Sequence, residues 1–216
     1  MQPHRRIILM VEATSSYGRG CLRGIARYAR SHAGWAFLHS PRSLIERMKL
    51  RDLQAWNPEG VIARIELPDT AELIRQLNLP TVDLRAPQNL PGMTGVYTDD
   101  RKVMDVAEAH LLNNGLKRLA FCGYPGIDYS DNRQAEFLKS PNDERIERIV
   151  FEPPPLRGPH GASVSYERRG EHDAAALQTW LKNLPKPIGI IACNDTRARQ
   201  ILLACMAADV RVPYDV

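Results

Sequence analysis

The sequence predicts an α/β protein in which parallel sheets carry helices on both faces. Short apolar runs alternate with helical periods along most of the chain, and this pattern restarts after residue 98. The first run, Ile7–Val11, is apolar at every position, as expected of a strand covered on both faces. Strands and helices that alternate at such short spacing are typical of a doubly wound parallel sheet.

The first half of the chain, residues 1–98, is expected to form one lobe. Its predicted strands cover residues 7–11, 35–39, 60–63 and 80–84. Helical periods cover residues 19–33 and 44–56, and a third helix begins at Pro68. The first of these helices is expected to end near Gly34, because glycine after the last apolar position is a common helix stop.

The second half, residues 99–216, is expected to form a second lobe that begins with a helix. Asp99 and Asp100 suit its N-terminus, where carboxylates meet unpaired N–H groups and the positive end of the helix dipole. His110 is interpreted as a hydrogen-bonded core residue of this helix. The whole predicted apolar stripe consists of Val103, Val106, Ala107, His110 and Leu111.

Further strands are predicted at residues 119–122, 149–151 and 188–192, with helices at 171–183 and from Asn194 to Ala208. The proline-rich residues 152–168 predict an irregular connection. Residues 210–216 are interpreted as a loop that enters another strand. We therefore expect the second lobe to be incomplete in this chain.

Composition excludes several classes of protein. Lys and Arg exceed Asp and Glu by 29 to 25, a mild excess spread along the 216 residues that is weak support for nucleic-acid binding. The four cysteines (Cys21, Cys122, Cys193 and Cys205) are far apart and are interpreted as buried free thiols rather than metal ligands. With no secretory signal and no run of about 20 apolar residues, we expect a cytoplasmic protein that does not enter a membrane.

Enzyme and cofactor sites find little support in the sequence. The glycine pattern Gly18–Gly24 opens a helix after a strand, but five residues separate it from that strand, and no acid follows the second strand. A dinucleotide fingerprint requires both features. There is no GxSxG motif and no histidine paired with a nucleophile in a known motif. We expect no enzyme activity, no cofactor and no metal.

Polar residues gather in the loops that follow the predicted strands, where open parallel sheets bind ligands. Guanidinium, carboxylate and amide groups can each bind two neighbouring hydroxyls of a sugar, and a tyrosine ring can cover its apolar face. Composition alone does not distinguish a sugar site from a solvated rim. The candidates are residues 14–19, Arg64, Arg85, Asp99, residues 124–133, Asn194 and Asp195.

Several motifs also point to a known family. They are residues 16–20 (SYGRG), 24–28 (GIARY), 60–63 (GVIA), 115–123 (GLKRLAFCG) and, most specifically, 180–199 (WLKNLPKPIGIIACNDTRAR). In this order they resemble the effector-binding domain of bacterial sugar-responsive transcription regulators with a periplasmic-binding-protein-like, LacI-like fold. The likeness is greatest to the xylose-responsive members, and it extends over almost the whole chain.

The resemblance implies two Rossmann-like lobes of the type I fold, which close on a monosaccharide, with a pentose such as xylose as the expected effector. It implies that Arg133 forks onto sugar hydroxyls and that Asp195 and Asp99 are ligand-binding acids. It also implies that the loop with Ser16, Tyr17 and Arg19 covers the ligand. Arg64, Arg85 and Asn194 are carried over from their positions in the loops.

The resemblance further implies a homodimer that binds operator DNA through a domain absent from this chain. In xylose-type regulators that domain resembles AraC and follows the sensor. Two alternatives remain open: a solute-binding protein of the same fold, used in transport or chemotaxis, and an enzyme with a nucleotide cofactor.

Overall fold

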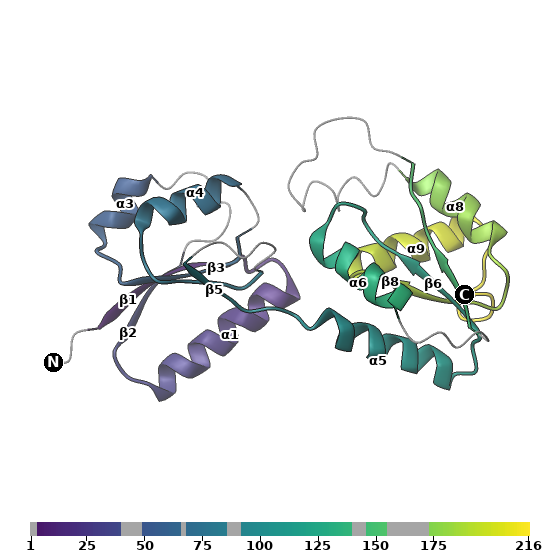
Figure 1. Ribbon diagram of the computed structural model, residues 1–216, viewed down its shortest axis with the longest axis horizontal. Coiled ribbons are helices and arrows are strands. Elements are labelled where there is room, and N and C mark those ends of the chain that lie inside the picture. Colours follow the sequence, from purple (N-terminus) through teal and green to yellow (C-terminus); the bar gives the residue numbers. More distant parts are fainter. Residues whose placement is uncertain (1–3, 40–48, 66–67, 86–91, 140–145, 155–172) are drawn as a thin grey trace. The chain divides into compact units, whose positions relative to one another are not determined.

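The computed structural model describes residues 4–39, 49–65, 68–85, 92–139, 146–154 and 173–216. The chain divides into two compact units, unit 1 (Met1–Thr98) and unit 2 (Asp99–Val216). Each unit contains its own parallel sheet with helices packed against it (Figure 1). The α/β class predicted from the sequence is confirmed.

Unit 1 contains a five-stranded parallel sheet with the strand order β2-β1-β3-β4-β5. The strands are β1 (Arg5–Met10), β2 (Trp35–His39), β3 (Gly60–Ala63), β4 (Thr81–Asp83) and β5 (Met93–Gly95). Helix α1 (Ser16–Ser31) lies on one face, and α3 (Leu50–Ala55) and α4 (Pro68–Leu77) lie on the other (Figure 1). The buried side chains of β1 and β3 form the core with Leu53 of α3 and Ile74 of α4.

Helix α1 begins in very close contact with the loop that precedes it. Ser15 is its N-cap, since the hydroxyl accepts a hydrogen bond from the Gly18 N–H at 2.9 Å. A Cβ atom at Gly18 would lie 2.0 Å from the backbone oxygen of Glu12. Only glycine therefore lets the first turn of α1 approach the end of β1 this closely.

Unit 2 contains a three-stranded parallel sheet with the order β7-β6-β8. The strands are β6 (Arg118–Cys122), β7 (Glu147–Val150) and β8 (Gly189–Ala192). The helices are α5 (Asp100–Asn113), α6 (Asp128–Lys139), α8 (Ala174–Asn183) and α9 (Asp195–Ala207). One core cluster lies between the sheet and helices α8 and α9, and the other contains Met104 of α5 and Phe137 of α6.

Two buried ion pairs cross-link unit 2. Arg197 of α9 is fully buried, and its two terminal nitrogens donate to the two carboxylate oxygens of Asp173 at 3.0 and 2.7 Å. Arg148 of β7 donates to both carboxylate oxygens of Glu108 on α5, at 2.9 and 2.8 Å. Removing one partner of such a pair leaves a buried charge without compensation, which costs about 3–5 kcal/mol.

Most predicted elements are present with shifted ends. Helix α1 begins three residues before the predicted position because Ser15 caps it. Within the predicted helix at 44–56, the described residues form α3 at Leu50–Ala55, and residues 44–48 lie outside the described part of the chain. Residues 155–168 of the predicted irregular connection also lie outside the described part of the chain. The final segment, residues 210–216, forms turns, and the Asp215 carbonyl accepts from the Ile188 N–H.

The predicted apolar stripe of α5 is wrong at three positions. Val103 and Val106 are 37% and 72% exposed, and the His110 side chain is also exposed. The buried residues of α5 are Met104 and Glu108. Glu108 is buried because it pairs with Arg148, so a charged residue occupies a core position and displaces the apparent apolar face.

Among the described helices, none combines the length and the apolar character needed to cross a membrane.

Candidate functional site

In each unit, two neighbouring strands mark the point where the chain changes direction across the sheet. These are β1 and β3 in unit 1, and β6 and β8 in unit 2. The loops at the carboxyl ends of such strands separate and leave room for a ligand. Polar side chains gather at these two places, and the polar groups of unit 1 and unit 2 are described separately below.

The polar group of unit 1 is built around Glu12, two residues after the end of β1. Its side chain is 7% exposed, and one carboxylate oxygen accepts from the Ser15 hydroxyl at 2.6 Å and from Arg64 at 3.1 Å. Arg64 follows β3, and its guanidinium carbon lies 5.6 Å from the ring centre of Tyr17, a cation–π contact. The carboxylate thus holds the arginine next to an aromatic ring.

Tyr17 also connects α1 to the loop after β4. Its hydroxyl donates to the Leu84 carbonyl at 2.8 Å. Burial raises the pKa of Tyr17, and neighbouring Cys21 raises it further, so the phenol stays protonated near neutral pH. Asp83, at the end of β4, accepts from the N–H groups of Ile65 and Arg85 through one oxygen. Its other oxygen is buried without a hydrogen-bond partner among the described residues.

The polar group of unit 2 is built around Arg133 on α6. Its Nε donates to Asp100 at 2.9 Å, and a terminal nitrogen donates to the Cys193 carbonyl at the end of β8. Its guanidinium carbon lies 5.4 Å from the ring centre of Tyr129, one turn earlier on α6. Arg133 and Asp100 are 18% and 15% exposed, so the pair is partly open to solvent.

Asn194 joins this polar group to α9. Its side-chain oxygen caps α9 by accepting from the Arg197 N–H at 2.8 Å, and its amide nitrogen donates to the Tyr129 hydroxyl at 2.8 Å. The capping bond and the tyrosine bond fix the orientation of the amide. The unit 2 group therefore offers a guanidinium, a carboxylate, an amide and a phenol within one cluster.

The structure brings some of the predicted site residues together. Tyr17 contacts Arg64 in unit 1, and Arg133 and Asn194 share Tyr129 as a neighbour in unit 2. Arg85 lies two residues after the end of β4, next to Leu84, whose carbonyl accepts a hydrogen bond from Tyr17.

Other predicted site residues have different local roles. Arg19 donates to the carbonyls of Ala13 and Thr14. Asp99 caps α5 by accepting from the Lys102 N–H, and hydrogen bonding to Lys102 lowers the pKa of this exposed carboxyl. Ser16 and Asp195 are exposed in the first turns of α1 and α9.

Two members of these groups, Glu12 and Asp100, were not predicted from the sequence. They are the carboxylates that hold the two arginines, whereas Tyr129, which covers Arg133, lies within the predicted candidate range 124–133. Glu12 ends the apolar run Ile7–Val11, and an acid at the end of a predicted strand could have identified it as a candidate site residue. No sequence signal pairs Asp100 with Arg133, because their contact depends on how α5 and α6 pack.

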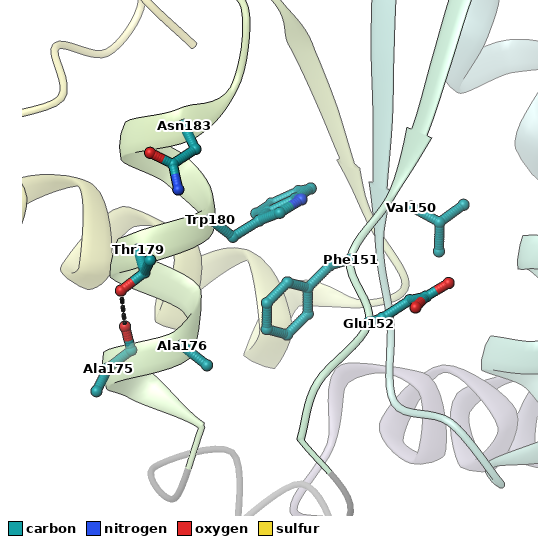
Figure 2. A pocket seen from close by; sticks show the side chains of 8 residues that line it. All are labelled: Val150, Phe151, Glu152, Ala175, Ala176, Thr179, Trp180 and Asn183. Carbon is teal, nitrogen blue, oxygen red and sulfur yellow. Dashed lines mark hydrogen bonds between the residues drawn. The ribbon is translucent and has the colours of Figure 1, made fainter.

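A separate hollow of about 540 Å³ lies between β7 and α8 in unit 2 (Figure 2). Its walls include Phe151 and Trp180, whose ring centres are 5.1 Å apart, and Glu152 lies at its edge. None of the predicted site residues lines it. Within the part of the chain that the structure describes, no three His, Cys, Asp or Glu side chains are grouped as metal ligands.

Residues 109–216, half of the chain, match the family model described as a periplasmic binding protein-like domain. The chain belongs to this family. Its expected fold, with polar loops at the carboxyl ends of parallel strands, agrees with the two sheets described above. A membership of this kind does not by itself define the ligand.

Several named proteins are similar to this member of the family. The xylose operon regulatory proteins of Escherichia coli (strain K12) and Haemophilus influenzae are 27% and 26% identical to it, over 96% and 100% of the chain. The chain spans about half the length of these relatives, 52% and 54%. Both are named as regulators, not as enzymes.

Solved structures show the same fold. A xylose-binding transcription activator superposes with a TM-score of 0.76 at 24% identity, over 98% of this chain and 52% of that one. The trehalose repressor from Escherichia coli superposes with a TM-score of 0.65 at 13% identity, over 97% of this chain and 77% of that one.

Proposed function

We propose that this chain is the sugar-sensing part of a bacterial transcription regulator, with a pentose such as xylose as its effector. One observation carries the proposal. At the carboxyl ends of β6 and β8, Arg133, Asp100 and Asn194 present fixed donors and acceptors beside the ring of Tyr129. Adjacent hydroxyls on a sugar ring need planar, bidentate partners of this kind, and a ring to cover the apolar face.

The chemistry of the group favours binding over catalysis. A nucleophile activated by a base requires the two side chains in hydrogen-bond contact. The groups around Arg133 are instead a carboxylate paired with the arginine, a carbonyl, and an amide that donates to a phenol, an arrangement that suits hydrogen bonding to hydroxyls. We therefore propose a sensor rather than an enzyme.

The named relatives support a regulator over a transport protein of the same fold. Both curated relatives are described as regulators of a xylose operon. We propose that the polar group of unit 1, with Tyr17 and Arg64, also contributes to sugar binding. Sugar binding that stabilises one arrangement of the protein over another shifts the population between them.

We further propose that this shift acts on operator DNA in the cytoplasm. We propose that an AraC-like DNA-binding domain outside these residues makes the contact with DNA, and that the whole protein acts as a homodimer. Coupling of this kind needs different sugar affinities in the two arrangements.

Calorimetric titration of the full-length gene product tests the proposal. D-xylose, L-arabinose, D-ribose, D-glucose and D-galactose form the panel. Asp195 follows Asn194 at the start of α9 with its side chain exposed. We expect saturable binding of at least one pentose, and a tenfold or greater loss in Arg133→Ala and in Asp195→Ala, because each substitution removes a proposed partner of the sugar hydroxyls.

Arg101→Ala is the matched control for these variants. Arg101 is also in unit 2, its side chain is 78% exposed, and it is 3.9 Å from Asp105. This variant is expected to bind sugar like the parent protein. If none of the five sugars binds, the sensor function is wrong; if Arg133→Ala binds as tightly as the parent, the assignment of the site is wrong.

A further inference from the structure

The positive charge of this protein is concentrated in unit 1. Unit 1 contains 13 Lys and Arg against 8 Asp and Glu, whereas unit 2 contains 16 against 17. The excess of positive charge, expected from the sequence to be spread along the chain, thus belongs to one unit. Within unit 1, four of the arginines lie on a single helix, α1, which contains no acidic residue.

These arginines share one face of α1. Arg19, Arg23, Arg27 and Arg30 follow one another at intervals of four, four and three residues, and residues at these intervals are neighbours on a helix surface. All four side chains are exposed. The half-buried residues of α1 toward the sheet, Leu22 and Ile25, lie on the other side.

The last three arginines of this face, Arg23, Arg27 and Arg30, are named here the α1 basic stripe. Among the described residues none of the three forms an ion pair or a side-chain hydrogen bond. Arg19 is not included, because its guanidinium already donates hydrogen bonds to the carbonyls of Ala13 and Thr14. Three like charges side by side repel each other, so the stripe lowers the stability of the free helix unless an anion compensates it.

The spacing of the stripe fits a polyanion. Seven residues of helix separate Arg23 from Arg30, which is about 10 Å at 1.5 Å per residue. Over about 10 Å of its axis, one strand of duplex DNA carries about three phosphates. Arginine also binds phosphate oxygens with two parallel N–H groups, which suits this contact better than lysine does.

A membrane surface fits the stripe less well. A helix that binds a membrane inserts an apolar face beside its basic face. Leu22 and Ile25 face the sheet of their own unit, and the ring of the exposed Tyr28 stacks on His32. Between the arginines, Gly24 and Ala26 offer little apolar surface. The relatives of this chain are also named as transcription regulators, which act on DNA.

We infer that the α1 basic stripe binds the phosphate backbone of duplex DNA, so that the sensor part itself adds a sequence-independent contact to the regulator. This contact goes beyond sugar sensing and does not depend on it. It supplies affinity and position, not base recognition, because contacts to phosphates carry no direct sequence information. A sensor that touches DNA can hold the flanking duplex on one side of the bound site.

The test measures binding of the 216-residue chain to a fluorescent duplex of arbitrary sequence, by anisotropy, between about 50 and 200 mM salt. We expect weak binding that decreases steeply with salt. The Arg23→Gln/Arg27→Gln/Arg30→Gln variant is expected to lose at least tenfold in affinity at about 50 mM salt. Its log–log salt slope is expected to fall by about 2–3, because each phosphate contact contributes about 0.9.

Two further variants distinguish the effect of the stripe from the effects of net charge and of misfolding. Arg51→Gln/Arg75→Gln/Arg101→Gln removes the same charge from exposed arginines outside α1 and is expected to bind DNA within about twofold of the parent. Arg23→Lys/Arg27→Lys/Arg30→Lys keeps the charge and is expected to retain most of the salt slope. Glutamine forms helices well, and unchanged circular dichroism checks that each variant is folded.

Three results would overturn the inference: no salt-dependent binding by the parent chain, equal losses in the stripe variant and the Arg51/Arg75/Arg101 variant, or binding to anionic vesicles in preference to the duplex. Sugar titration of the stripe variant tests the proposed sugar binding independently of DNA binding. Unchanged sugar affinity is expected whether or not DNA binds.

Discussion

The polar groups of unit 1 and unit 2 use the same three kinds of side chain. In both, an arginine pairs with a carboxylate and lies over a tyrosine ring. Arg64 is 3.1 Å from Glu12 and 5.6 Å from the Tyr17 ring centre. Arg133 is 2.9 Å from Asp100 and 5.4 Å from the Tyr129 ring centre.

The two groups differ in where these side chains come from. In unit 1 the acid lies between β1 and α1, the tyrosine lies in the first turn of α1, and the arginine follows β3. In unit 2 the arginine and the tyrosine share α6, and the acid begins α5. The carboxyl ends of the central strands decide which side chains meet, and different helices can supply them.

The two groups also differ in the buried residues that support them. In unit 2 the helix that Asn194 caps carries Arg197, which is fully buried and paired with Asp173. Arg197 also lies 4.9 Å from the ring centre of Tyr124, whose hydroxyl donates to Gln200. In unit 2, the helix that carries part of the polar group is therefore held in place by a buried ionic network.

The largest expected effect is on this network. Arg197→Ala is expected to lower the free energy of unfolding by about 3–5 kcal/mol, because it leaves the Asp173 carboxylate buried and unpaired. Arg64→Ala in unit 1 is expected to cost clearly less, since Ser15 still donates to Glu12. Urea unfolding measures both variants.

A double variant sharpens this comparison. Arg197→Met combined with Asp173→Leu removes both charges and is expected to recover part of the loss, as replacing a whole buried pair often does. Equal losses in Arg197→Ala and Arg64→Ala would show that the buried network does not distinguish the two units.

Next in size is the effect of the two helix caps. Ser15→Ala in unit 1 and Asn194→Ala in unit 2 are each expected to cost about 0.5–2 kcal/mol, because each removes the acceptor of a first-turn N–H group. Thermal unfolding measures the loss. Asn194→Asp keeps a capping oxygen and is expected to stay near the parent in stability, whereas a loss as large as that of Asn194→Ala would contradict the capping role.

A smaller effect is expected at the tyrosine of unit 1. Tyr17→Phe keeps the ring over Arg64 and removes the hydrogen bond to the Leu84 carbonyl, at an expected cost below about 1 kcal/mol because the site is partly open to water. Tyr129→Phe removes the bond to the Asn194 amide and is the matching variant in unit 2. A double-mutant cycle of Tyr129→Phe with Asn194→Ala is expected to show coupling of about 0.5 kcal/mol or more, and strict additivity would show that the two side chains do not interact.

The smallest expected effect concerns the cysteines. Cys21 of unit 1 is half-buried, whereas Cys122, Cys193 and Cys205 of unit 2 are buried. Burial raises the pKa of Cys122 to about 12, so its reactive thiolate is scarce at pH 8. Iodoacetamide at pH 8 is expected to label Cys21 first, as followed by mass spectrometry. Faster labelling of any unit 2 cysteine would show that unit 2 opens more readily than unit 1.

The elements of the fold were largely predictable because local patterns determine them. The continuous apolar runs identified β1, β3, β6 and β8, and a single capping residue explains why α1 begins early. The short strand β5 was not predicted, since Met-Thr-Gly has no apolar run. The inward face of α5 was wrong because a buried ion pair, invisible in one sequence, occupies the place of an apolar residue.

The candidate site was predictable to a different extent. The arginines Arg64 and Arg133 lie where the carboxyl ends of strands suggested, since topology follows from the order of elements. Their carboxylate partners Glu12 and Asp100 were missed, because these contacts join residues 52 and 33 positions apart. The distances between such loops depend on packing, and a single sequence does not encode them locally.

The close approach at Gly18 also limits how this protein can be redesigned. Any side chain there collides with the backbone of Glu12, so a mutant library that varies this loop will yield glycine alone at that position, even though it lies inside a helix. Variation around the Tyr17 loop must therefore come from its neighbours, and inheritance of this glycine is a marker by which distant homologues with the same loop can be found.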